Sequence, residues 1–242
     1  MRVSATDLQN AFGKYLSLVQ KEDIIIERNG KIVAKMVAYS GADPLVIHEG
    51  SYGYKTSRTI SYDDYLALVE SSDQRYELIG GEVYLLASPS FTHQVVVSEI
   101  AAHFYAFFKG RPCRALTAPL DVRLFGYATK FEEDPNVVQP DIVVICDEDK
   151  VDASGRYEGI PTLIVEVLSP TTKGKDLATK LHLYMRSGVA EYWVVDPERK
   201  CISQYVFTPD RDINHLQTIA DGGSIESAVL QGLAVSLGEI WP

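Results

Sequence analysis

Apolar side chains recur at helical spacing over residues 8–19, and this predicts a short amphipathic helix. An Ile-rich run ends at Asn29-Gly30, and a second apolar run follows over residues 31–38. Asn-Gly favours a tight hairpin because both turn positions take positive φ values. With a short strand over residues 1–3, the pattern predicts a small β-α-β-β module over residues 1–40.

Glycine and proline break the pattern over residues 41–58, and no periodicity holds there, which predicts a linker. Beyond it, short continuous apolar runs predict strands buried on both faces, at residues 142–146, 163–168 and 191–196. Amphipathic segments predict helices at residues 62–69, 90–108 and 175–186. Gly80-Gly81 between two further apolar runs predicts a hairpin. Residues 59–242 are therefore expected to form one α/β domain, a mixed sheet with helices on both faces.

The composition changes this picture in one respect, the distribution of charge. The 242 residues carry 23 Lys+Arg and 33 Asp+Glu, a net charge of -10, which argues against a protein that coats nucleic acid or anionic membrane. Hydrophobic residues make up 46% of the chain, so a disordered chain is excluded. Residues 1–40 hold 6 basic and 4 acidic side chains, against 17 and 29 in the remainder. The small module therefore carries a local positive balance.

Cysteine usage and hydropathy bear on the compartment. Cys113, Cys146 and Cys201 are far apart and odd in number, so we expect three buried thiols, no disulfide and a reducing compartment. No signal-peptide pattern and no membrane-length apolar run is found, and we expect a cytoplasmic protein.

The first 40 residues resemble the Phd/YefM antitoxin family. The resemblance rests on four segments in order: Val3–Leu8, Gly13–Leu16, Ile24–Gly30 and Val33–Met36. It implies a dimerising module that binds operator DNA, and so a homodimer. By this resemblance, the residues that face DNA are Arg2, Thr6 and Asn10. A dimerisation hairpin without a DNA role is the alternative. A folded domain follows in place of a toxin-wrapping tail, so no toxin partner is expected.

Acidic side chains interrupt the buried strands of the larger domain. Glu166 lies inside an apolar run, Asp141 directly precedes another, and Glu77 lies in the first strand of the hairpin. A carboxylate in a central strand is costly unless it is paired or binds a metal. Oxygen ligands suit Mg²⁺ or Mn²⁺, and no His/Cys spacing supports zinc. Lys180 stands one helical turn before Tyr184, so both project from one face and Lys180 could assist a water or phosphate.

The chain from about residue 62 to 207 also resembles the Uma-type family, which belongs to the PD-(D/E)XK nuclease superfamily. Six segments carry the resemblance: Tyr76–Glu82, Ser88–His93, Gln139–Val143, Ile164–Pro170, Lys180–Tyr184 and Gly188–Pro197. It implies a restriction-endonuclease-like mixed β-sheet flanked by helices, whose metal-bound carboxylates cleave phosphodiester bonds.

Individual roles follow from this second resemblance. It identifies Asp141 and Glu166 as metal ligands and Glu77 as an additional acid. Leu168 stands where the superfamily has a lysine, so Lys180 takes that role from the following helix. His93 would orient a water or contact phosphate.

Each of these residues has a purely structural alternative. Glu166 could form an ion pair with Lys180, Asp141 could cap a turn, and Glu77 could pair with Arg75 or Arg114. His93 could be an ordinary helix-start residue, and Lys180 could pair with Asp176. Several acids in buried strands together favour a site over these alternatives.

Three functions remain open from the sequence. The first is an Mg²⁺- or Mn²⁺-dependent endonuclease that acts on nucleic acid, with DNA expected, and uses Lys173 and Lys175 as further phosphate contacts. The second is a catalytically silent nuclease fold that binds nucleic acid or protein. The third is a regulator whose N-terminal module represses its own operator. No nucleophile elbow or phosphate-cradling glycine loop supports another chemistry.

Overall fold

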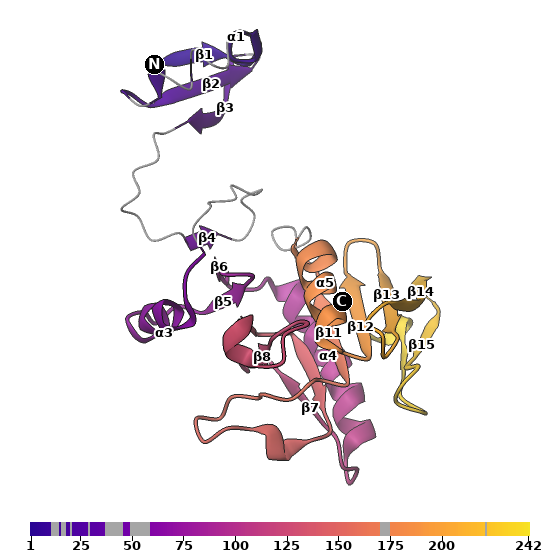
Figure 1. Ribbon diagram of the computed structural model, residues 1–242. Helices are drawn as coiled ribbons and strands as arrows, with labels where there is room; N and C mark the ends of the chain where they lie inside the picture. The colour runs from indigo at the N-terminus through magenta and orange to yellow at the C-terminus, as the bar shows by residue number, and fades with distance from the viewer. Residues whose placement is uncertain are drawn as a thin grey trace. The chain divides into compact units, whose positions relative to one another are not determined.

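The computed structural model divides into two compact units, Met1–Pro44 and Leu45–Pro242, which are described separately (Figure 1). The structure describes residues 1–10, 15, 18–19, 21–28, 30–36, 46–48, 59–169, 175–220 and 222–242. Predictions that concern other positions lie outside the described residues, and Lys173 is one of these.

The first unit contains a three-stranded sheet and a short helix. Its elements are β1 (Arg2–Ser4), α1 (Ala5–Asn10), β2 (Ile24–Arg28) and β3 (Lys31–Met36). Strand β1 pairs in parallel with β2, and β2 pairs antiparallel with β3. Arg28 is opposite Lys31, and Gly30 has a φ of 72°, as the predicted hairpin requires. Buried apolar side chains on β1, β2 and the residues between them form a small core.

One sheet of the second unit has five strands in the order β4-β6-β5-β9-β8. Their bounds are β4 (Val46–His48), β5 (Tyr76–Ile79), β6 (Glu82–Leu85), β8 (Val122–Leu124) and β9 (Asn136–Val138). Strand β4 lies inside the predicted linker and pairs in parallel with β6. The sequence pattern did not reveal β4 or β9, because three residues are too few to show a periodicity.

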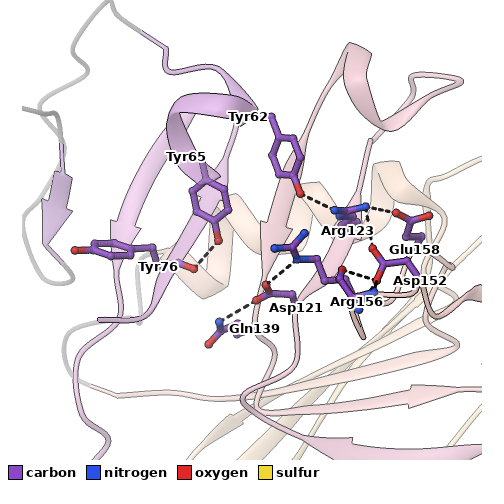
Figure 2. A network of polar contacts seen from close by, with 10 residues as sticks. Tyr62, Tyr65, Tyr76, Asp121, Arg123, Gln139, Asp152, Arg156 and Glu158 are labelled. Carbon is purple, nitrogen blue, oxygen red and sulfur yellow. Dashed lines mark hydrogen bonds and ion pairs between the residues drawn. The ribbon is translucent and has the colours of Figure 1, made fainter. Parts of the chain in front are cut away.

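Helix α3 (Tyr62–Glu70) packs with this sheet through an apolar cluster and a polar network. Ser61 and Asp64 form a capping box at its start. Arg123 of β8 donates to the hydroxyl of Tyr62 at 2.7 Å and pairs with Glu158 and Asp152 (Figure 2). Through these contacts, the largely buried side chain of Arg123 links helix α3 to strand β8.

The other large sheet has six strands in the order β14-β13-β12-β11-β10-β7. Their bounds are β7 (Arg114–Thr117), β10 (Ile142–Ile145), β11 (Leu163–Val167), β12 (Glu191–Asp196), β13 (Cys201–Phe207) and β14 (Ile213–Ala220). Strands β11 and β12 are parallel, and the other neighbours are antiparallel. The central strands are fully buried, as their continuous apolar runs predict.

Helices pack against both faces of the six-stranded sheet (Figure 1). Val165 and Val167 join the apolar cluster of α4 (Phe91–Phe108), whereas Ile164 joins that of α5 (Leu181–Ser187). A π-helical segment, Lys175–Lys180, precedes α5. The mixed sheet with flanking helices is therefore present as predicted. Among the described residues, no helix is long and apolar enough to cross a membrane.

The remaining elements are short. They are the 3-10 helices Phe131–Glu133, Glu148–Lys150 and Leu237–Glu239 and the paired strands β15 (Ser224–Glu226) and β16 (Ala234–Ser236). The buried carboxylate of Glu191 accepts hydrogen bonds from Trp193, Gln204 and Ser227. This carboxylate thereby ties the segment before β16 to the centre of the six-stranded sheet.

Cys113 and Cys146 form a disulfide, so the prediction of three free thiols is wrong. Arg114 of β7 is opposite Ile145 of β10, and the two cysteines stand at the next position of this antiparallel register. Their Cα atoms lie 4.1 Å apart although 33 positions separate them in the chain. Sheet register creates this proximity, which sequence spacing does not reveal. The expectation of a reducing compartment rested on the absence of a disulfide, and this argument no longer holds.

Candidate active site

Asp141 and Glu166 lie on neighbouring antiparallel strands. Ile142 of β10 is opposite Val165 of β11, and continuing this register places Asp141 opposite Glu166. Oδ2 of Asp141 accepts the backbone N–H of Val167 at 2.8 Å. The carboxylate of Asp141 is therefore fixed against the strand that carries Glu166.

His93 approaches Asp141 from helix α4. Its Nε2 lies 3.2 Å from Oδ2 of Asp141, and its ring is almost fully buried. The backbone N–H of His93 donates to Ser90, the residue that caps α4. The first turn of α4 therefore places an imidazole beside Asp141.

Glu166 is held from the opposite face of the sheet. Its Oε1 accepts from Nζ of Lys180 at 2.8 Å and from the hydroxyl of Tyr184 at 2.6 Å. Burial raises the pKa of Tyr184 well above its ordinary value, and the charge of Glu166 raises it further. Tyr184 therefore remains a neutral donor at physiological pH. The helical spacing of Lys180 and Tyr184 lets both reach one carboxylate oxygen.

Lys180 also binds Glu77, the acid of strand β5. Nζ of Lys180 lies 2.9 Å from Oε1 of Glu77, which also accepts the backbone N–H of Gln139 at 2.9 Å. Glu77, Glu166 and Lys180 are each exposed by less than 5%. A buried charge is costly unless it is paired, so one lysine compensates two carboxylates here. Asp141 follows Gln139 by two positions, which connects both parts of the site.

The donor set fits a hard divalent cation. Glu77, Asp141 and Glu166 carry three negative charges against one on Lys180, so two remain when His93 is neutral. Among the described residues, no three of His, Cys, Asp or Glu are placed to hold one ion together. Mg²⁺ is commonly held by one or two carboxylates and completes its coordination with water and phosphate oxygens. Asp141 and Glu166 match that pattern.

Of the alternatives from the sequence, the Glu166–Lys180 ion pair is present. Glu77 pairs with Lys180, and Arg114 pairs with Glu148. The structure thus brings all five predicted catalytic residues into two connected groups, Asp141 with His93 and Lys180 with the two glutamates.

The structure describes the side chains of only some residues that were predicted to contact nucleic acid. Arg2 is exposed and pairs with Glu27 at 3.0 Å, and Thr6 is exposed in α1. Asn10 ends α1 and Lys175 begins the π-helical segment, but their side chains are not among those described. Phosphate binding by these residues stays a prediction.

Sequence reasoning missed two contacts of the site. Tyr184 shares a helix face with Lys180, but its hydrogen bond to Glu166 was not predicted. The backbone N–H of Gln139 holds Glu77, and backbone donors leave no signal in side-chain patterns. Spacing by one helical turn was the signal that could have identified Tyr184.

Residues 62–238 match the model of the Uma2 family, described as "Putative restriction endonuclease". Two curated proteins of Synechocystis sp. are similar, both described as uncharacterized. Protein slr1290 is 25% identical over 136 residues, 56% of this chain and 67% of that protein. Protein sll1609 is 24% identical over 178 residues, 73% of this chain and 97% of that protein.

A crystal structure from Anabaena variabilis, described as a putative nuclease belonging to DUF820, has a similar fold. Its TM-score is 0.60 at 20% sequence identity, over 75% of this chain and 97% of the other. This similarity extends the nuclease-like fold to most of the chain.

Proposed function

The chain belongs to the Uma2 family, and from this premise we propose that it is a divalent-metal-dependent endonuclease that hydrolyses phosphodiester bonds of DNA. The observation that supports the proposal best is the opposed pair Asp141 and Glu166 beside the ammonium of Lys180. Two carboxylates on neighbouring strands supply ligands for a cation, and a lysine from the helical segment before α5 supplies a positive charge for a phosphate.

Asp141 and Glu166 would hold Mg²⁺ or Mn²⁺, with Glu77 as the additional acid. A divalent cation in such a site polarises the phosphate and lowers the pKa of a coordinated water. Lys180 pairs with both glutamates, and its ammonium can donate to a water or a phosphate oxygen. His93 orients the carboxylate of Asp141 and can pass a proton at Nε2.

The first unit is proposed to dimerise the protein and to contact DNA. Strand β3 is at the edge of its sheet, and Ile32 and Val33 on it are 60% and 56% exposed. An exposed apolar edge strand is a template for pairing with another chain. This supports a homodimer, with Arg2 and Thr6 at the start of each module available to phosphate.

A second candidate is a silent nuclease fold that binds nucleic acid or protein. One observation favours it: Lys180 is already bound by both Glu77 and Glu166. For catalysis, Lys180 must give up part of this contact to a water or phosphate, whereas a binding protein requires no such exchange.

Cleavage of supercoiled plasmid by the full chain separates the two candidates. With Mg²⁺ or Mn²⁺ we expect nicking that EDTA abolishes and that falls at least a hundredfold in Asp141→Asn and Glu166→Gln. Glu198→Gln, which changes an exposed carboxylate elsewhere, is the matched control. If wild type leaves plasmid, linear and single-stranded DNA intact with both metals, the enzyme is excluded and the silent fold remains.

A further inference from the structure

A groove of about 410 Å³ lies along helix α4 and ends in the candidate active site. Gln94, Ser98 and Tyr105 of α4 line it, with Thr117 at the end of β7 facing them. Asp141 belongs to the same lining. A molecule that occupies this groove therefore lies next to one of the two proposed metal ligands.

Helix α4 carries two exposed aromatic rings, and one of them, Tyr105, lines the groove. Phe91 is 81% exposed and Tyr105 is 68% exposed. Phe91, Ser98 and Tyr105 are spaced by seven residues, so they follow one stripe of α4. Phe91 also precedes His93 by two positions, which places one ring at the end of α4 nearest to Asp141. An exposed aromatic ring offers a face on which an unpaired base can stack.

The lining favours bases rather than a duplex backbone. Gln94, Ser98 and Thr117 are neutral hydrogen-bonding groups, and none of the described residues that line the groove is Lys or Arg. Duplex-binding surfaces rely on basic side chains, because the phosphates face outward. Aromatic faces stack only with bases that are not already stacked within a helix. The exposed rings therefore fit unpaired nucleotides.

The length of the stripe fits a short single strand. Fourteen residues separate Phe91 and Tyr105, about 21 Å along the helix axis. At 3.4 Å per nucleotide, this spans about six stacked nucleotides. Lys109 and Arg111, both exposed, follow at the C-terminal end of α4. They follow the end of α4 that is away from His93, and their positive charge can contact phosphates there.

We propose that this groove binds single-stranded DNA, with bases stacked on Phe91 and Tyr105 and a phosphodiester bond directed toward Asp141. The inference rests on the proposed nuclease function and names its substrate class. The preferred substrate is an unpaired stretch, such as a frayed end, a flap or a gap, rather than an intact duplex.

Binding of a fluorescent twelve-nucleotide oligo(dT) to the full chain in EDTA tests the groove without any cleavage. Phe91→Ala and Tyr105→Ala should each weaken binding by about 5- to 150-fold, the range for loss of one base–aromatic stack. Tyr127→Ala is the matched control, because Tyr127 is 61% exposed on a different part of the surface. A duplex of equal length should bind more weakly than oligo(dT).

Equal binding of the duplex, or unchanged oligo(dT) binding in both aromatic variants, overturns the inference. Light scattering on the same variants identifies another occupant: if Tyr105→Ala dissociates a dimer, a second copy covers the groove and the inference fails. Cleavage with Mn²⁺ distinguishes this failure from that of the proposed function. If duplex cleavage requires Asp141 but is unchanged by both aromatic substitutions, the proposed nuclease function holds and the proposed groove is excluded. If oligo(dT) binding requires both rings but the wild-type protein cleaves no DNA, the groove binds single strands and the proposed nuclease function is excluded.

Discussion

Nζ of Lys180 lies 2.8 Å from Oε1 of Glu166, and both side chains are almost completely buried. The pair joins the helical segment before α5 to the central strand β11. Water cannot readily replace either partner at this depth. Each charge therefore depends on the other for compensation, and Glu77 depends on the same lysine.

Replacement of Lys180 by Met should destabilise the protein strongly. The substitution leaves Glu77 and Glu166 buried without their cation, and loss of one partner from a buried pair costs about 3–5 kcal/mol. Urea unfolding followed by circular dichroism measures the change. Combining Lys180→Met with Glu166→Gln should restore part of the loss, because one uncompensated charge is removed. A double variant less stable than Lys180→Met would contradict the ion-pair account.

Binding of Mn²⁺ should depend on both strand-end carboxylates. Removing either charge leaves one carboxylate ligand, so Asp141→Asn and Glu166→Gln should each weaken binding at least tenfold. Isothermal titration of the full chain measures the affinity, with Glu198→Gln as the control. Wild-type affinity in both variants would place the cation elsewhere.

Stability should fall at alkaline pH through the buried tyrosines. Burial is the largest cause of the raised pKa of Tyr184, whose ordinary value is 10.0. The folded state therefore holds this proton more tightly than the unfolded chain, so its stabilising effect is complete below about pH 10 and is lost as the pH rises toward the folded pKa.

Each such group contributes a slope of up to about 1.4 kcal/mol per pH unit. Burial is also the largest cause of the raised pKa values of Tyr65, Tyr84 and Tyr157, so these groups add to the loss of stability at alkaline pH. Tyr184→Phe should reduce the slope of unfolding free energy between pH 10 and 11.5, whereas Tyr127→Phe, an exposed position, should leave it unchanged. An identical slope in Tyr184→Phe and wild type would count against this assignment.

Reduction of the Cys113–Cys146 disulfide should lower stability without changing the fold. The bond closes a loop with a sequence separation of 33, for which chain entropy predicts about 3–4 kcal/mol. Thermal unfolding with and without dithiothreitol measures the difference, and Cys113→Ser should abolish it. Cys201→Ser is the control, because Cys201 does not belong to this disulfide. A reductant effect that persists in Cys113→Ser would exclude this bond as its source.

Ile32→Lys should dissociate the proposed homodimer. A charge on an exposed edge strand opposes pairing with a second chain, and Ile32 lies on the edge strand β3. Light scattering across a concentration series measures the mass. Ile213→Lys makes the same change on β14, the edge of the six-stranded sheet. If only Ile213→Lys dissociates the dimer, the interface lies on β14 and not on β3.

Local chemistry was sufficient to predict most elements near the site. Ser61 and Ser90, both serines directly before an amphipathic segment, cap their helices, and Gly188 ends α5 with a φ of 90°. These features depend on hydrogen bonds and backbone angles within a few residues. The acids Asp141 and Glu166 could be singled out for the same reason, since a carboxylate within or beside an apolar strand is visible locally.

The sequence by itself determined the longer helices, the buried central strands and which acids require compensation. Tertiary structure alone decided which partners meet: Lys180 pairs with Glu77, which is distant from it in the sequence, and Cys113 meets Cys146 across a sheet. Periodicity and capping arise from neighbours in the chain, so a sequence displays them directly. Strand register and helix packing bring distant residues together, and they depend on burying the whole core at once, which no local pattern records.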